Sequence, residues 1–163
     1  MIRPTSDKVR QAIFNVLYSK SAVNGAHVLD GFCGTGALGL EALSQGAAHC
    51  VFFDKNRTSL NLCRDNIALL KEEENTHCVI HDTTKPLQRP EQLKPINLAF
   101  LDPPYGKNMV EQAIETLKTA NWLTPDCWLV IEMGKSEEIN SPVSINEEKH
   151  YGDTKVIFAQ MKA

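Results

Sequence analysis

The sequence lacks a long hydrophobic run. None of its apolar stretches approaches the ~20 residues that a membrane-spanning helix needs, and its first residues lack the apolar stretch of a signal peptide. We therefore expect a cytoplasmic protein with no membrane partner.

Paired cysteines and an excess of basic charge are also lacking. The 5 cysteines form no Cys-x-x-Cys pair and the 5 histidines show no metal-ligand spacing, so we expect neither disulfides nor a metal site. The formal net charge of −3 gives the molecule as a whole no attraction for nucleic acid. A nucleic-acid partner would have to meet a local basic patch.

The remaining composition is that of an ordinary globular protein. The chain has 163 residues, of which 42% are hydrophobic and 23% charged, a size and composition that fit one domain with a sizeable core. We expect a single domain over residues 1–163 that acts as a monomer. Residues 1–20 should form a flanking helix, capped within Thr5-Ser6-Asp7.

Short apolar runs alternate with amphipathic stretches along most of the chain, which predicts strands alternating with helices. Strands are expected at residues 26–30, 50–54, 76–81, 97–101 and 128–133, and helices at 37–45, 58–71 and 110–120. Two further strand-like segments, 144–151 and 155–161, are joined too closely for a helix to lie between them. The pattern predicts an α/β fold, mostly parallel, with an appended antiparallel pair.

A glycine-rich loop, residues 30–39, follows the first predicted strand and contains a Gly-x-Gly-x-x-Gly pattern. Glycine permits a tight turn and a close approach to a ligand, and the start of the next helix supplies unpaired N–H groups. Alone, the pattern could be a tight turn. The strand before it, the helix after it and Asp54 about twenty residues later favour a nucleotide-type site.

Asp30 separates two classes of cofactor by charge. A dinucleotide would bring its pyrophosphate to this loop, where a carboxylate at about 4 Å costs on the order of 4 kcal/mol at an effective dielectric constant of about 20. S-adenosylmethionine brings a sulfonium and an ammonium instead, and a negative Asp30 favours both. The alternative is that Asp30 only caps a turn or helix. The predicted cofactor-binding residues of the loop are Asp30, Phe32, Gly34, Gly36 and Leu38.

Carboxylates also follow the second and third predicted strands. Ligands in such sheets collect beyond the carboxyl ends of the strands, so we expect Asp54, with Lys55 beside it, to accept hydrogen bonds from the two ribose hydroxyls. Asp82 is expected to accept from the adenine amino group. Either acid could instead cap the segment that follows it.

The fourth predicted strand ends in Asp102-Pro103-Pro104-Tyr105, four residues that we predict to be catalytic. Because proline has a fixed φ and no N–H, the neighbouring carbonyls are held in an extended path. The Asp102 side chain and the Pro103 carbonyl can accept the two N–H bonds of a planar amino group, while Tyr105 stacks on the ring behind it. This grip would steer the nitrogen lone pair toward a sulfonium methyl. The segment predicts methylation of an amine, with a proline-rich structural turn as the alternative.

The loop pattern together with residues 102–105 is similar to class I amino-methyltransferases. Residues 3–15 and the late Tyr151-Gly152-Asp153-Thr154 resemble the RsmD-type 16S rRNA (guanine-N2)-methyltransferases, a likeness that covers nearly the whole chain. The resemblance implies a Rossmann-like class I methyltransferase fold: a seven-stranded, mostly parallel sheet with an antiparallel last strand and helices on both faces. It also implies S-adenosylmethionine as methyl donor and a guanine of 16S rRNA as acceptor.

The resemblance further bears on how RNA is held. Family members usually carry a short basic segment before the Arg-Pro-Thr stretch, and we expect it to be absent here or trimmed. The remaining candidates for RNA contacts are Arg3, Thr5, Lys8, Arg10 and Lys107. Because these offer few phosphate contacts, we expect the substrate to be rRNA within a small-subunit assembly particle.

Two other functions stay open on the sequence alone. An adenine-N6 or protein-glutamine methyltransferase could use the same tetrapeptide, although such enzymes often need a separate recognition domain. A catalytically silent binding subunit is the other possibility. Since such a subunit has no need for Asp30, Asp54, Asp102 and Tyr105 together, the sequence favours an enzyme, and the resemblance implies guanine N2 as the atom that it methylates.

Overall fold

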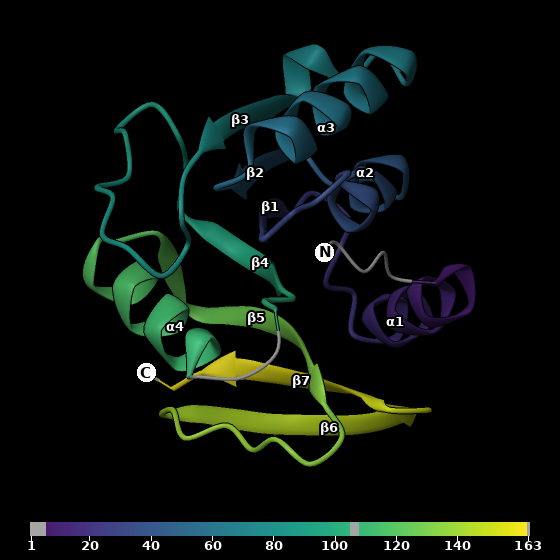
Figure 1. The fold of residues 1–163 in the computed structure, drawn as a ribbon, viewed down its shortest axis with the longest axis vertical. Coiled ribbons are helices and arrows are strands. Elements are labelled where there is room, and N and C mark those ends of the chain that lie inside the picture. Colours follow the sequence, from purple (N-terminus) through teal and green to yellow (C-terminus); the bar gives the residue numbers. More distant parts are fainter. Residues whose placement is uncertain (1–5, 105–107, 163) are drawn as a thin grey trace.

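The computed structural model describes residues 6–104 and 108–162 and consists of helices and strands around one sheet (Figure 1). The helices are α1 (Asp7–Ser19), α2 (Ala37–Ser44), α3 (Arg57–Leu69) and α4 (Met109–Thr119), with a 3₁₀ turn at Glu73–Asn75. The strands are β1 (His27–Gly31), β2 (His49–Asp54), β3 (Thr76–Ile80), β4 (Ile96–Leu101), β5 (Leu123–Gly134), β6 (Val143–Tyr151) and β7 (Thr154–Met161). No helix in these ranges is long and apolar enough to cross a bilayer.

The strands form one seven-stranded sheet in the order β3-β2-β1-β4-β5-β7-β6. Strands β1 to β5 run parallel to one another, and β7 is antiparallel to both β5 and β6. The predicted mostly parallel sheet with an antiparallel last strand is confirmed. From β1 the chain order runs outward to β3 on one side, whereas β4 lies on the other side. The carboxyl ends of β1 and β4 therefore flank the switch point at which open α/β sheets bind ligands.

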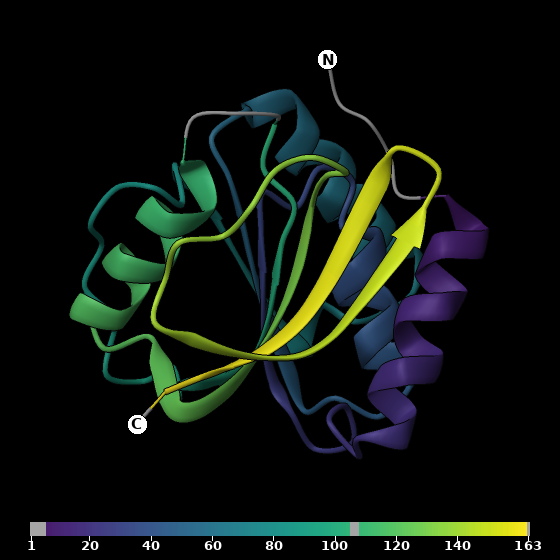
Figure 2. The ribbon, with the colours of Figure 1, turned by 90° about the horizontal axis from the view of Figure 1, so that it is seen from below.

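Helices cover both faces of the sheet, with α4 on one side and α1 on the other (Figure 2). Alternate residues of a strand point to opposite faces, so the adjacent Phe52 and Phe53 of β2 belong to different cores. Phe52 packs with Phe100 beneath α1, α2 and α3, whereas Phe53 packs with Trp122 beneath α4. Both faces of the central strands β1, β2 and β4 are thus largely buried, as their apolar sequences require, whereas the edge strand β3 is partly exposed.

The helix cap predicted at residues 5–7 lies at Ser6. The Ser6 Oγ accepts a hydrogen bond from the Val9 amide at 3.2 Å, which satisfies one unpaired N–H group of the first turn of α1. The apolar positions Ile13, Phe14 and Leu17 then bury one face of the helix in the core. The flanking helix predicted for the first twenty residues therefore packs directly on the sheet.

Strand β5 is longer than predicted. The apolar pattern placed it at residues 128–133, but it already pairs with β4 at Leu123, opposite Ile96. A register shift follows before Leu98 pairs with Trp128. Pro125 lies in this irregular stretch, and because proline cannot donate to a strand ladder, the sequence there did not resemble a strand.

Candidate functional site

The glycine-rich loop between β1 and α2 is held by groups from three elements. The Gly39 amide donates to Asp30 Oδ2 at 2.9 Å, and the Gly34 amide donates to Asp54 Oδ2 at 2.8 Å. From α3, Asn66 Nδ2 donates to the Thr35 carbonyl at 3.1 Å. The loop is therefore fixed by β1, β2 and α3 through contacts of the protein itself.

The glycines of the loop serve two different purposes. Gly34 has a left-handed φ of +56°, which the turn itself requires. A Cβ atom at Gly36 would lie 2.5 Å from Cys63 Sγ, and one at Gly39 would lie 2.5 Å from the Phe52 ring. Gly36 and Gly39 therefore allow α2 to pack closely on the elements behind it. Phe32 also has a left-handed φ, +60°, which costs a residue with a side chain about 1–2 kcal/mol.

Asp30 is buried, with 3% of its surface exposed. Burial raises the pKa of Asp30 to about 8; the Gly39 N–H opposes this, and the nearby acids Glu132 and Asp54 add to it. The sequence argument gave Asp30 a negative charge. Its burial opposes that negative charge, and a bound cation would favour the ionised form.

Asp54 joins the glycine loop to the start of α3. Its Oδ2 accepts from Gly34, and its Oδ1 accepts from the Asn56 amide at 2.8 Å. The capping position of α3 belongs to Asn56, whose side chain accepts from the Ser59 amide at 3.0 Å. Each carboxylate oxygen of Asp54 has a second lone pair, so Asp54 can also accept from two hydroxyls. The exposed Lys55 follows it directly.

Asp82 lies beyond the end of β3. Its Oδ1 accepts from the Thr84 amide at 2.9 Å and from the Thr84 hydroxyl at 2.7 Å. Burial raises the pKa of Asp82. The two hydrogen bonds from Thr84 and the charges of Lys55 and Lys85 lower the pKa by more than burial raises it, so the pKa lies below its ordinary value. Asp82 is thus an ionised hydrogen-bond acceptor at this edge of the sheet.

The neighbouring Thr83 provides an independent sign of a polar ligand. Its side-chain oxygen is buried and has no hydrogen-bond partner among the residues that the structure describes. A Cβ at Gly31, the last residue of β1, would lie 3.1 Å from the Thr83 methyl group. Buried hydroxyls are nearly always hydrogen-bonded, so this oxygen fits a polar group bound beyond the end of β1. By contrast, the Leu38 side chain packs in the core and leaves only its backbone for a ligand.

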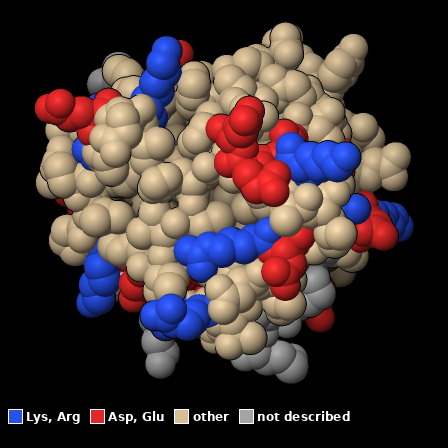
Figure 3. Space-filling model, turned by 90° about the horizontal axis from the view of Figure 1, so that it is seen from above, with Lys and Arg blue, Asp and Glu red and all other residues tan. Residues whose placement is uncertain are grey.

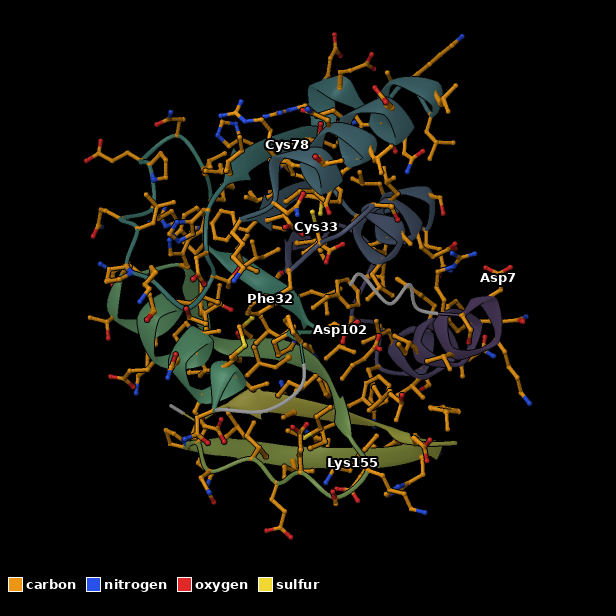
Figure 4. The ribbon with its side chains drawn as sticks, viewed as in Figure 1. Asp7, Phe32, Cys33, Cys78, Asp102 and Lys155 are labelled. Carbon is orange, nitrogen blue, oxygen red and sulfur yellow. The ribbon has the colours of Figure 1, made fainter. Side chains whose placement is uncertain are left out.

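The tetrapeptide predicted to grip an amine begins directly after β4. Asp102 and Pro103 are half-buried and Pro104 is exposed, while Tyr105 lies outside the described residues. Leu101 pairs with Gly31 of β1, so Asp102 lies beside the glycine loop, and Figure 4 shows it next to Phe32. The cofactor loop and the predicted amine site are therefore adjacent.

A cavity of about 210 Å³ adjoins Pro103 and Pro104. Its other walls come from the start of α4 and from the end of β5 with the loop that follows. Its carboxylate-bearing residues are Glu111, Glu132, Glu137 and Glu138. The cavity is large enough for a group the size of a nucleobase, and every charged residue of its lining is an acid.

Two carboxylates of this wall hold the segment after β5. Glu137 Oε2 accepts from the Gly134 amide at 2.7 Å, and Glu111 Oε2 accepts from the Asn140 amide at 2.9 Å. The buried Lys155 of β7 donates a hydrogen bond to the Glu137 carbonyl. The outer wall of the cavity is thus tied to α4 and β7.

The residues predicted to contact RNA are only partly described. Lys8 is exposed on α1, whereas Arg10 pairs with Asp7 at 2.9 Å and with Glu41 of α2 at 3.8 Å. The Arg10 guanidinium is therefore engaged within the protein. The other three candidates, Arg3, Thr5 and Lys107, lie outside the described residues. On the described part of the face over α3 and β3, basic and acidic side chains are interspersed (Figure 3).

Sequence analysis missed three features of the site. The first is Asn66, which anchors the glycine loop through the Thr35 carbonyl. No local sequence pattern in α3 indicates this role. The second is Glu132, a 3% exposed acid near the end of β5, whose place within the apolar run of residues 128–133 was a visible signal. The third is the contact of the Cys33 thiol in the loop with Cys63, which in turn contacts Cys78. All five cysteines are free thiols, and four of them are buried.

Comparison with known proteins gives consistent matches. The family model described as "Conserved hypothetical protein 95" matches residues 1–160. "Ribosomal RNA small subunit methyltransferase D" of Haemophilus influenzae is 34% identical over 142 residues, which cover 86% of this chain and 72% of that protein. The solved structure "Putative methyltransferase yhhF from Escherichia coli" has a TM-score of 0.84 at 30% identity and covers 99% of this chain and 89% of that one.

A more distant structure supports the fold. An RNA methyltransferase from Salinibacter ruber, solved in complex with S-adenosyl-L-homocysteine, has a TM-score of 0.73 at 12% identity and covers 98% of this chain and 94% of that chain. The Rossmann-like class I methyltransferase fold is confirmed, and these methyltransferase relatives support S-adenosylmethionine as the cofactor. With a family match over residues 1–160 and a relative at 34% identity, the chain belongs to the RsmD-type methyltransferase family that the sequence resembled.

Proposed function

We propose that this protein transfers the methyl group of S-adenosylmethionine to small-subunit rRNA and that the acceptor is the exocyclic N2 of a guanine. The observation that carries the proposal is the pairing of Gly31 with Leu101, which brings the glycine loop and Asp102 to adjacent strand ends. A methyl donor held by the loop would lie next to an amine held after β4. The name of the 34% identical relative, a small-subunit rRNA methyltransferase, supports rRNA as the acceptor.

The residues at the ends of β1, β2 and β3 suit the three parts of the cofactor. Asp54 would accept from the ribose hydroxyls, and the ionised Asp82 would accept from the adenine amino group. The buried Asp30 lies behind the loop, where a cationic methionine part would favour its ionised form. The unpartnered Thr83 oxygen adds a further polar contact. The bound cofactor supplies an electrophilic methyl group on its sulfonium.

The acceptor side would act by position. The Asp102 carboxylate and the Pro103 carbonyl accept the two N–H bonds of the amine, and Tyr105 covers the base. With both protons held, the nitrogen lone pair points toward the sulfonium, and the geometry of the grip supplies most of the rate enhancement. A guanine inside an RNA helix cannot reach this position, so the base has to leave its stack.

The test compares methyl incorporation into protein-free 16S rRNA, a partly assembled small subunit and an unrelated RNA. The labelled nucleotide is identified by nuclease digestion and mass spectrometry. We expect N2-methylguanine, with the particle labelled faster than protein-free rRNA because ribosomal proteins present the target loop. Equal labelling of the two would exclude the need for presentation. N6-methyladenine as product would exclude guanine and leave methyl transfer standing.

A further inference from the structure

Glu132 is a buried carboxylate for which the proposed reaction has no use so far. Across the sheet, Asp30 pairs with Phe100 of β4, and Phe100 pairs with Val130 of β5. The register ends at Leu101, which pairs with Ile131; Asp102 is the first residue after β4 and Glu132 the next residue of β5. By strand alternation both continue the row of Phe100 and Val130, and we infer that Glu132 lies beside Asp102, the group proposed to hold the amine.

Two further observations place Glu132 at the acceptor. It contributes to the wall of the 210 Å³ cavity together with Pro103 and Pro104. Its charge also acts on Asp30, so that it lies on the cofactor side of this cavity. Burying an acid that is only 3% exposed costs free energy. At the wall of a cavity, a bound group can offset this cost by donating a hydrogen bond to the acid. A carboxylate has about four acceptor positions, so an interaction made within the fold leaves others for a base.

The chemistry of such a pair of acids distinguishes the purines. In guanine, the N2 amine lies next to N1–H, which is a second donor. Two adjacent carboxylates therefore face three N–H bonds, two on N2 and one on N1. In adenine, the N6 amine lies next to an N1 lone pair. A carboxylate facing that lone pair gains no hydrogen bond from the base and loses those that it made to water. Sites that hydrogen-bond a substrate group therefore discriminate strongly against analogues that lack the group.

We propose that Glu132 accepts a hydrogen bond from N1–H of the acceptor base while Asp102 holds the neighbouring amine, so that Glu132 selects guanine over adenine. The inference rests on the proposed function and adds a specificity residue to it. Asp102, after β4, would hold the amine of either purine. Glu132, on the neighbouring strand β5, would distinguish guanine from adenine.

A base that keeps the amine but lacks N1–H tests this contact. 2-Aminopurine carries the N2 amine beside an N1 lone pair; it also lacks O6, so the change of preference in a Glu132 variant, and not the wild-type preference alone, reports on N1. The experiment places guanine or 2-aminopurine at the target position of the same rRNA fragment, assembled into the particle, and measures single-turnover methylation at saturating S-adenosylmethionine. For the wild-type protein we expect a guanine preference of about 100-fold, near the upper range for one good hydrogen-bonded base contact.

The variant Glu132→Gln tests the residue, because its amide can donate to the N1 lone pair. At saturating S-adenosylmethionine, we expect its guanine preference to fall at least about 10-fold, with the rate on 2-aminopurine rising. Glu115→Gln removes an equal charge from an exposed position on α4 and should keep the wild-type ratio. A ratio in Glu132→Gln equal to that of the wild type would overturn the proposal.

Two outcomes need a second measurement or a separate interpretation. If Glu132→Gln is inactive on both bases, competition binding of the two RNA fragments gives the same preference ratio without turnover, and an unchanged ratio there also overturns the proposal. If the wild-type protein does not methylate guanine at N2, both the proposed function and the proposed role of Glu132 are wrong. Normal guanine methylation with an unchanged ratio in the variant removes only the role of Glu132.

Discussion

The two halves of the sheet build their parts of the site by different means. In the half formed by β1, β2 and β3, each predicted cofactor acid accepts from a backbone amide close to its own strand end: Asp30 from Gly39, Asp54 from Gly34 and Asp82 from Thr84. In the half that begins with β4, Asp102 and Glu132 become neighbours only through the register of two strands. The first half depends on loop geometry, the second on strand pairing.

This difference separates the consequences of mutation. The acids of the first half are proposed to face the cofactor, so their loss should appear in cofactor affinity. The acids of the second half are proposed to face the acceptor, so their loss should appear in turnover or in the choice of base. Single substitutions in each half can therefore separate a loss of cofactor affinity from a loss of turnover.

The largest effect is expected for Asp102→Ala. Because Asp102 is proposed to position the amine, its removal should lower the single-turnover rate by about 100-fold or more, the scale of a misplaced reacting group. Cofactor affinity, measured by calorimetry, should stay within about twofold of the wild type, since no cofactor contact is removed. Asp126→Ala, at an exposed acid of β5, is the matched control. An equal loss of cofactor affinity in Asp102→Ala would contradict the division.

The next effect concerns Asp54→Ala. Charge-assisted hydrogen bonds contribute ~1.5–3 kcal/mol, so the loss of the ribose contact should weaken binding of S-adenosylmethionine by roughly 10- to 150-fold. The Gly34 amide also loses its acceptor, which loosens the loop. Calorimetry measures the affinity, with Asp65→Ala on the exposed side of α3 as control. Unchanged affinity would remove Asp54 from the cofactor site.

A third effect tests whether the loop glycines serve packing. In Gly39→Ala the new Cβ would meet the Phe52 ring at 2.5 Å, an overpacking expected to cost about 1–3 kcal/mol of unfolding free energy. The melting temperature should fall by about 2–4 °C for each kcal/mol. Gly25→Ala is the contrast, because its Cβ meets nothing within 4 Å and only its φ of +75° opposes the change. A smaller loss in Gly39→Ala than in Gly25→Ala would mean that α2 can shift away from β2.

The smallest effect is a pH dependence of cofactor binding. The pKa of Asp30 is raised to about 8, and a cationic ligand favours the ionised carboxyl, so binding below pH 8 requires loss of a proton. Affinity should therefore rise with pH, by about threefold between pH 7.5 and 8.5 for a single group of this pKa. Asp30→Asn keeps an acceptor for Gly39 and should remove this dependence. Calorimetry across the range decides, and a wild-type affinity independent of pH would exclude the coupling.

The same division explains what the sequence could predict. The glycine loop, Asp54 and residues 102–105 are short patterns or fixed spacings, so they could be identified from sequence. The lateral position of Glu132 follows from a register that includes an irregular stretch of β5, which no local pattern encodes. The protonation of Asp30 depends on burial by the whole fold. Proline at position 125 likewise concealed the first part of β5.

The place of β6 has a consequence for how the protein is made. β6 precedes β7 in the chain but lies outside it in the sheet, and in the described part of the chain it pairs with β7 alone. During synthesis, residues 143–151 therefore emerge before the strand that they need exists. An unpaired strand invites association with other chains. The charged, exposed Glu148 and Lys149 within β6 would oppose such association while the nascent chain waits for its inner neighbour.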